Sequence, residues 1–480
     1  MNGILRSLED THRYRRLVAM VLGIALLARL AVLVAFWPSW GWHNNAIPDQ
    51  WNELAINLVE HRTFAFSDSP DSPTALRGPL FPWLEVPLYL VFGKNYAGWV
   101  IVLLLYDVLT CSLLIVTVRR LWGPRPSLLA GLLYAINLPL IYYTCKISQV
   151  TSIMLFVVIW LYLITFWERH YFCRWVPPVT GLVSGLMILN KTVYLPLPLV
   201  SAALLLWLNR SKIRRLMHAA PVVLYLLVTF VVVAPWTIRN YVVTNGHLVP
   251  VQNLFWDAMV QNVLTHELDA AVGNDRPEGQ LLGYYIDKEN AIVAAAGLSL
   301  SPPRGRRGEW EMQREAAFRT AFLRMMKDDP WKILRVKADN VWQFWSLTEN
   351  REKTRLFLLM QTVPLSAAMI GFLVLCRYRQ LNQIAFGLVL IAVIWAEHCL
   401  VFAWGRYSLD LTPVLAVIFG LGMHLLVSRQ AREGKGVAAG EFGSEPVARV
   451  EEANLPANGA HHRCSLLYLR PSHNLDEPIQ

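Results

Sequence analysis

Long apolar stretches recur along the chain and are separated by short polar segments. A helix needs about 20 apolar residues to cross the hydrocarbon core of a bilayer, and about ten stretches approach that length. The pattern therefore predicts an all-α polytopic membrane protein with about ten transmembrane helices. These stretches are residues 17–37, 97–118, 127–144, 150–167, 176–190, 192–208, 218–238, 356–376, 384–404 and 409–427.

The first apolar stretch stands where a secretory signal peptide would stand. Its apolar region is longer than the roughly 7 to 15 residues of a signal peptide. It also contains Arg29, and no small-residue cleavage site follows it. We therefore expect residues 17–37 to be retained as the first helix.

Basic residues cluster in alternate loops, at 13–16, 119–125, 168–174, 209–215, 376–379 and 428–435. The positive-inside rule places these loops in the cytoplasm, so the other loops face outward. The predicted organisation is a cytoplasmic N-terminus at 1–16, a transmembrane region at 17–238 with a first outer loop at 38–96, an outer-face domain at 239–355, C-terminal transmembrane helices at 356–428 and a flexible cytoplasmic tail at 429–480.

The outer segment at 239–355 is the largest polar part between the apolar stretches. A helix is predicted before Pro330, where apolar residues recur at helical spacing. A second amphipathic stretch follows at 331–345. We expect a small helical domain that rests on the membrane with its tryptophans at the interface. The periodic apolar residues before Pro330 are Ala317, Phe318, Ala321, Phe322 and Met325.

Composition agrees with a membrane-embedded body. Hydrophobic residues make up 55% of the 480 residues and charged residues 16%, against roughly 25% charged residues in soluble domains. The net charge of +10 comes largely from the cytoplasmic flanks, so nucleic-acid binding is not predicted. The six cysteines indicate neither a disulfide framework nor a metal site. The chain lacks a Walker loop and a dinucleotide fingerprint, which argues against ATP-driven transport.

A lone carboxylate follows the first apolar stretch. Asp49 lies about a dozen residues beyond residue 37 and close to the expected headgroup level. A carboxylate at the membrane boundary can act as a base on a lipid-linked substrate, so Asp49 is the first catalytic candidate. The alternative is that Asp49 caps the helix predicted to begin at Trp51, after Pro48.

Several cations fall on the predicted outer side, where the positive-inside bias does not place them. Arg77, Arg239 and Arg406 stand in outer loops or at outer helix ends, and an arginine presents a planar fork that suits phosphate oxygens. Snorkelling to lipid headgroups is the alternative for each. Lys146 and Lys191 lie in short outer turns and are weaker candidates, since such turns tolerate a stray lysine.

Four further ionisable residues are expected inside apolar stretches. Glu397 and His398 lie within the stretch at 384–404 and are a candidate for a polar pocket, with packing against a neighbouring helix as the alternative. Arg29 and Asp107 lie at matching depths, roughly 12 and 15 Å inside the outer ends of the first two helices. Because consecutive antiparallel helices are usually neighbours, we predict an ion pair between Arg29 and Asp107. The alternative is that each is solvated separately.

The order of several segments resembles that of a known family. PDQWNELAINL and TALRGPLFPWL follow the first helix, and FGKNYAGW begins the second. Together they are similar to bacterial relatives of the protein O-mannosyltransferases and of the lipid A aminoarabinose transferase. Further similar segments are GLVSGLMILNKTVYLPLPLV, APWTIRNYVVTNGHLVPV and GRYSLDLTPVLA, so the resemblance covers most of residues 17–428.

The resemblance implies a GT-C fold and an inverting glycosyltransferase of the bacterial inner membrane. Such enzymes take a sugar from a polyprenyl-phosphate donor on the outer, periplasmic face, and their acceptors include glycolipids, glycans and proteins. A transporter or flippase of a lipid-linked sugar is the alternative, although the chain shows no convincing internal repeat of the kind that transporters often carry.

The resemblance also implies roles for individual residues. Asp49 matches the family's first-loop aspartate, and Arg77 stands where relatives carry a basic residue that contacts the carrier phosphate. Glu53 is a second catalytic candidate, although Gln50 and Glu53 stand where many relatives carry an Asp-Glu pair and a tyrosine. Gln149 stands near the position where many relatives carry an acidic residue. This chain therefore lacks a second candidate carboxylate there. We therefore predict no cofactor and assign no metal site, although a divalent metal remains an alternative.

Overall fold

The protein is described by a computed structural model that covers residues 2–40, 50–210, 219–272, 280–348 and 351–439. Every regular element in these ranges is a helix, and none is a strand. The all-α prediction is therefore confirmed. The chain divides into a compact unit, Met1–Arg429, and a second unit, Gln430–Gln480. Most of the predicted tail lies outside the described residues, so its flexibility stays a prediction.

Seven helical segments in the described ranges are long and apolar enough to cross a membrane. Two of them include the short 3₁₀ helices η4 (Leu381–Ile384) and η5 (Gly405–Leu411) at their starts. The protein therefore has the architecture of a multi-pass membrane protein. The α-helices of these segments are α1 (Asn2–Trp40), α4 (Tyr96–Trp122), α7 (Gln149–Arg169), α10 (Ala220–Val243), α15 (Arg351–Arg377), α16 (Ala385–Leu400) and α17 (Thr412–Ala439).

Three of the ten predicted spans differ from straight, full-length helices. The span predicted at 127–144 is divided between α5 (Pro124–Ala135) and α6 (Leu138–Thr144), which are bent by 61° at their junction. Asn137 causes the restart, because its side chain accepts a hydrogen bond from the amide of Leu140 at 3.1 Å and so caps α6.

The spans predicted at 176–190 and 192–208 form shorter apolar helices, α8 (Val176–Asn190) and α9 (Leu197–Leu208). Lys191 is extended between them and is followed by the 3₁₀ helix η2 (Thr192–Tyr194). Proline occupies the first turn of both α8 and α9. In that turn its missing N–H costs no helical hydrogen bond, but its ring disfavours a helix that continues from the residues before it.

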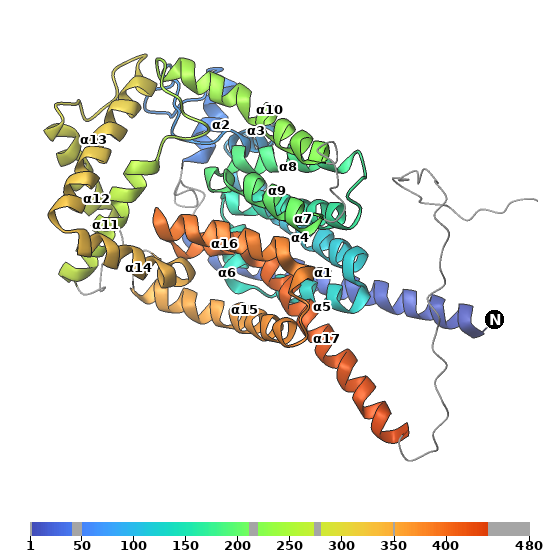
Figure 1. The fold of residues 1–480 in the computed structure, drawn as a ribbon. Coiled ribbons are helices and arrows are strands. Elements are labelled where there is room, and N and C mark those ends of the chain that lie inside the picture. Colours follow the sequence, from blue (N-terminus) through green and yellow to red (C-terminus); the bar gives the residue numbers. More distant parts are fainter. Residues whose placement is uncertain (1, 41–49, 211–218, 273–279, 349–350, 440–480) are drawn as a thin grey trace, which may run out of the picture. The chain divides into compact units, whose positions relative to one another are not determined.

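The loop predicted to face outward, at 38–96, contains two helices, α2 (Trp51–Glu60) and α3 (Leu80–Phe92). The outer segment carries α11 (Phe255–Val272), α12 (Gln280–Ala295), α13 (Arg307–Asp328) and α14 (Pro330–Ser346), of which α13 and α14 were predicted. Helices α11, α12 and α13 lie together, apart from the bundle of α4, α7 and α8 (Figure 1), and share a separate hydrophobic core around Val263, Leu264, Phe318 and Phe322.

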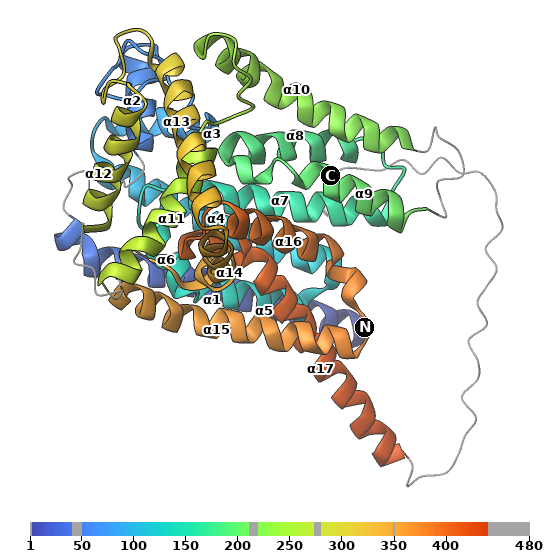
Figure 2. The same ribbon diagram turned by 60° about the vertical axis from the view of Figure 1, so that its left-hand side comes forward.

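Close packing of α8 against α10 fixes the position of the C-terminal end of α8. The two helices run side by side (Figure 2). Gly181 and Gly185 stand four residues apart on α8, and a Cβ atom at Gly181 would lie 2.6 Å from the carbonyl oxygen of Tyr225 on α10. Such paired small residues let helix backbones approach closely in membranes. The end of α8 at Asn190 is thereby held against the bundle.

The predicted ion pair between Arg29 and Asp107 is confirmed, and both side chains are fully buried. Asp107 also accepts a hydrogen bond from the hydroxyl of Tyr134 at 2.6 Å. Arg29 donates to the carbonyl oxygen of Ala135 at 3.1 Å, at the end of α5 where the chain bends. The pair therefore joins α1, α4 and α5 in one polar network inside the apolar body.

Breaking this pair should destabilise the protein strongly. Arg29→Asp or Asp107→Arg alone leaves two like charges buried, and removing one partner of a buried pair costs about 3–5 kcal/mol. The double variant that exchanges the two charges should recover much of the loss, as measured by thermal unfolding in detergent. Arg120→Asp, at an exposed position of α4, is the control and should change little. Additive losses in the double variant would contradict a direct interaction.

Candidate active site

The carboxylates of the first outer loop are the first part of the candidate site. Asp49 lies outside the described residues. Gln50 occupies the N-cap position of α2 with a φ of 56°, and its side chain makes no capping hydrogen bond. Glu53, in the first turn of α2, accepts a hydrogen bond from the amide of Ser67 at 3.0 Å. Glu53 thus ties the following loop to α2, and its catalytic role stays a prediction.

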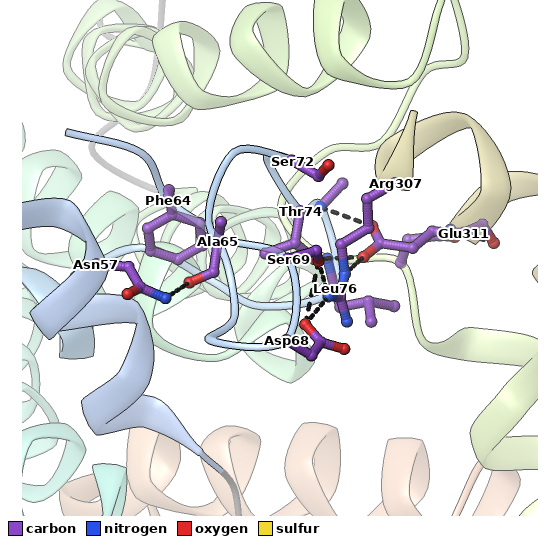
Figure 3. Close-up of polar contacts among 12 residues, drawn as sticks. Asn57, Phe64, Ala65, Asp68, Ser69, Ser72, Thr74, Leu76, Arg307 and Glu311 are labelled. Atoms are coloured by element: carbon purple, nitrogen blue, oxygen red, sulfur yellow. Dashed lines mark hydrogen bonds and ion pairs between the residues drawn. The ribbon is translucent and has the colours of Figure 1, made fainter. Parts of the chain in front are cut away.

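The loop between α2 and α3 is clamped by α13 of the outer segment (Figure 3). Glu311 accepts hydrogen bonds from the Thr74 hydroxyl at 2.5 Å and from the Ala75 amide at 2.8 Å. Arg307 donates to Glu311 at 3.0 Å and also contacts Asp68 of the loop. Burial raises the pKa of Glu311, and these hydrogen bonds act in the opposite direction. The clamp fixes the backbone two residues before Arg77.

Arg239 of α10 also holds this loop. Its guanidinium donates to the carbonyl oxygens of Thr74 at 2.5 Å and Phe64 at 3.4 Å. It also lies over the ring of Trp236, 4.6 Å from the ring centroid. These contacts make Arg239 a positioning residue for the loop, and phosphate binding by Arg239 stays a prediction.

Arg77 is the last residue of the clamped loop before Gly78, whose backbone packs against the end of α8. A Cβ atom at Gly78 would lie 2.5 Å from the carbonyl oxygen of Leu189, so only glycine allows this approach. The Arg77 guanidinium lies 5.2 Å from the ring centroid of Trp51. Its Nε atom is buried and has no hydrogen-bond partner among the described residues. Arg77 therefore stacks on the residue that stands two positions after Asp49.

A buried ion pair follows α8. Lys191 Nζ lies 2.7 Å from Asp410 Oδ2, and the Tyr194 hydroxyl donates to the same oxygen at 3.1 Å. Lys191 is 6% exposed and Asp410 is fully buried. Asp410 was missed in the sequence, although a carboxylate inside the apolar stretch at 409–427 is the same kind of signal as Asp107.

A stack of rings connects this pair to the outer segment. The His398 ring lies 4.3 Å from the Tyr407 ring and 5.6 Å from the Phe344 ring of α14, at interplanar angles of 10° and 27°. Lys191 Nζ lies over the Tyr407 ring, 4.8 Å from its centroid. Figure 2 shows α14 beside α16, which carries His398.

The remaining predicted residues lie around this stack or apart from it. Glu397 Oε2 lies 3.8 Å from His398 Nδ1, and Arg406 Cζ is 5.3 Å from the Tyr407 ring. The structure therefore brings Lys191, Glu397, His398 and Arg406 together. Lys146 instead lies over the ring of Tyr142, 4.5 Å from its centroid. No group of three or more metal-binding side chains occurs in the described ranges.

Comparison with known families supports the resemblance seen in the sequence. Residues 71–238 match the family model described as dolichyl-phosphate-mannose-protein mannosyltransferase. The match includes the loop with Arg77 and the end of α8 with Lys191. The predicted resemblance to protein mannosyltransferases is therefore confirmed over these residues. No curated protein sequence gives a significant match.

Two groups of solved structures are similar to this chain at low identity. The oligosaccharyltransferase AglB from Archaeoglobus fulgidus, in complex with an inhibitory peptide and a dolichol-phosphate, is 14% identical over 90% of this chain and 52% of that chain, with a TM-score of 0.47. ArnT from Cupriavidus metallidurans, bound to undecaprenyl phosphate, is 16% identical over 88% of this chain and 79% of that chain, with a TM-score of 0.38. Our chain thus spans about half the length of the oligosaccharyltransferase.

Loss of the Glu311 clamp should loosen the loop that carries Arg77. Glu311→Ala leaves the Ala75 amide and the Thr74 hydroxyl without their partner, and an unmade buried hydrogen bond costs about 1–3 kcal/mol. Amide hydrogen exchange should therefore speed up about 10-fold or more at residues 72–77. Arg324→Ala, at an exposed position of α13, is the control. Unchanged protection of the Ala75 amide in Glu311→Ala would show that the clamp does not hold the loop.

Proposed function

We propose that this protein is an inverting integral-membrane glycosyltransferase that moves a sugar from a polyprenyl-phosphate donor to a glycolipid, glycan or protein acceptor. The observation that carries the proposal is the match of residues 71–238 to the mannosyltransferase family. Those residues contain both the clamped loop with Arg77 and the end of α8. The predicted topology puts this site on the outer face of a bacterial inner membrane.

The reaction needs a base and a cation at the membrane boundary. In the proposed reaction, the Asp49 carboxylate takes the proton of an acceptor hydroxyl as its oxygen attacks the anomeric carbon of the donor sugar. The bond between that carbon and the phosphate oxygen breaks, and the polyprenyl phosphate leaves with increased negative charge. A fixed cation near the phosphate stabilises that charge.

Arg77 suits this cation role better than the other cations of the site. Among the described residues it has no ion-pair partner, whereas Lys191 is neutralised by Asp410. Trp51 holds the plane of the Arg77 guanidinium, and the Nε atom has an unused N–H. The clamp by Glu311 and Arg239 fixes the adjoining backbone. Such a preorganised arginine fork favours phosphate oxygens over less polar ligands.

Asp49→Asn tests the base directly. The amide cannot take the acceptor proton, so turnover should fall by at least about 10²-fold while donor binding stays unchanged. Transfer from a radiolabelled polyprenyl-phosphate sugar to an acceptor, in purified protein, gives the measurement. Asp71→Asn, an exposed carboxylate of the same loop, is the matched control. Near-normal turnover of Asp49→Asn would remove Asp49 from the mechanism.

Movement of the labelled lipid across vesicles without any transfer product would favour a transporter or flippase.

Arg77→Ala should act on donor binding. Hydrogen bonds to a charged group contribute about 1.5–3 kcal/mol, so the affinity for polyprenyl phosphate should fall about 10- to 100-fold. Arg77→Lys should recover part of the affinity, since lysine keeps the charge without the fork. Lys94→Ala, an exposed cation two residues before α4, serves as the control. An affinity in Arg77→Ala equal to that of the wild type would refute the assignment.

A further inference from the structure

A cavity of about 260 Å³ lies between α1 and α4, at the ends of these helices that the positive-inside rule places in the cytoplasm. This volume exceeds that of a few water molecules, which take about 30 Å³ each. It falls short of the roughly 300–1,000 Å³ that encloses a whole small-molecule ligand. The cavity therefore suits one part of a larger ligand. Its lining includes Arg15 and Arg119 together with apolar side chains such as Val18, Leu22 and Val116.

One wall of the cavity is fixed by Tyr14. The Ser127 hydroxyl donates its proton to the carbonyl oxygen of Pro124 at 2.7 Å, so the Tyr14 hydroxyl is the donor in its 2.9 Å bond to Ser127. The Arg119 guanidinium lies over the Tyr14 ring, with Cζ 4.3 Å from the ring centroid. This contact uses the face of the guanidinium and leaves the N–H groups at its edge available to an anion.

The charges on the cavity favour an anionic ligand. Arg15 directly follows Tyr14, so both arginines belong to one cavity, and its described lining includes no acidic residue. Neither Arg15 nor Arg119 forms an ion pair with any described residue. Two like charges at one site repel each other, and an anion between them removes that cost. Basic pockets between transmembrane helices on the cytoplasmic side bind the head groups of anionic lipids in this way.

The apolar surface next to the cavity favours a lipid over a soluble anion. Val116 lines the cavity, and Leu109 and Leu105 stand 7 and 11 residues before it, on the same face of α4. All three side chains are exposed. From Val116 to Leu105 this face extends for about 16 Å, close to half of the roughly 30 Å hydrocarbon core. An acyl chain can therefore lie along α4 from the cavity toward the middle of the bilayer.

We propose that α1 and α4 bind an anionic phospholipid of the cytoplasmic leaflet, with its phosphate between Arg15 and Arg119 and an acyl chain along α4. The site is independent of the proposed function. It lies about 34 Å along α4 from Tyr96, the first residue of that helix, whose hydroxyl accepts a hydrogen bond from α2. The bound lipid joins α1 to α4 at this end, as the pair of Arg29 and Asp107 does further along the same helices.

Lipid binding to the purified full-length protein in detergent, followed by native mass spectrometry, tests the site. Phosphatidylglycerol and phosphatidylcholine with identical acyl chains are the ligands. In the wild type, phosphatidylglycerol should bind at least about 10-fold more tightly. Arg15→Gln and Arg119→Gln should each reduce this preference about 5-fold, the effect of one basic residue near an anionic lipid. Ala19→Trp fills the cavity without changing the charge and should abolish the preference.

Three control variants change exposed neighbours that do not line the cavity. Arg16→Gln, Arg120→Gln and Met20→Trp should each leave the preference within about 2-fold of the wild-type value, as is usual for surface changes. Arg15 and Ala19 are exposed, so their variants complete the test even if Arg119→Gln fails to fold without its contact to Tyr14.

Three results would overturn the proposal. Equal affinity of the wild type for the two lipids would show that the cavity does not select an anion. Equal losses in the cavity variants and in their control variants would show a diffuse attraction to the basic surface. Displacement of bound phosphatidylglycerol by inorganic phosphate would show a site for a free anion, with no part for the acyl chain.

Discussion

Pairing of charge inside an apolar body is the constraint on which the rest of this structure depends. A charged side chain in hydrocarbon costs at least about 2.5 kcal/mol even on the mildest scales, so a buried charge that gains an opposite partner favours assembly of the helices that carry the pair. Arg29 and Asp107 join α1 to α4 and to the bend before α6. Lys191 and Asp410, 219 residues apart, join the end of α8 to η5. These two pairs set which helices can be neighbours.

The candidate site is assembled from segments that are far apart in the sequence. The loop with Arg77 follows α2, yet Arg239 of α10 and Glu311 of α13 hold it. Phe344 of α14 similarly supports the ring stack that ends at Lys191. The contacts of the segment at 239–355 therefore help to fix the geometry of the loop and of the buried pair.

Local pattern and helix depth could be predicted from the sequence, and long-range partners could not. Apolar run length predicts the spans, and matching depth predicts the Arg29–Asp107 pair. Proline in the first turn of α9 explains why that helix begins at Leu197, inside its apolar run at 192–208. The partnership of Glu311 with Thr74 joins residues 237 positions apart, and no local pattern contains it. Asp410 could have been found by the reasoning that identified Asp107, because it too is a carboxylate inside an apolar stretch.

Side chains of the same type differ here in whether their polar atoms have partners. The paired ones hold the structure together, and the unpaired ones are available to a ligand. The Asn240 side chain donates to the carbonyl oxygens of Val249 and Val251 at 3.2 and 2.9 Å, whereas the oxygen of Asn190 has no partner among the described residues. Arg239 bonds to loop carbonyls, whereas Arg77 keeps an unused Nε. Folding alone would favour satisfying every buried polar group. The unpartnered Nε atom of Arg77, the residue before Gly78, is therefore better explained by selection for a ligand than by selection for stability.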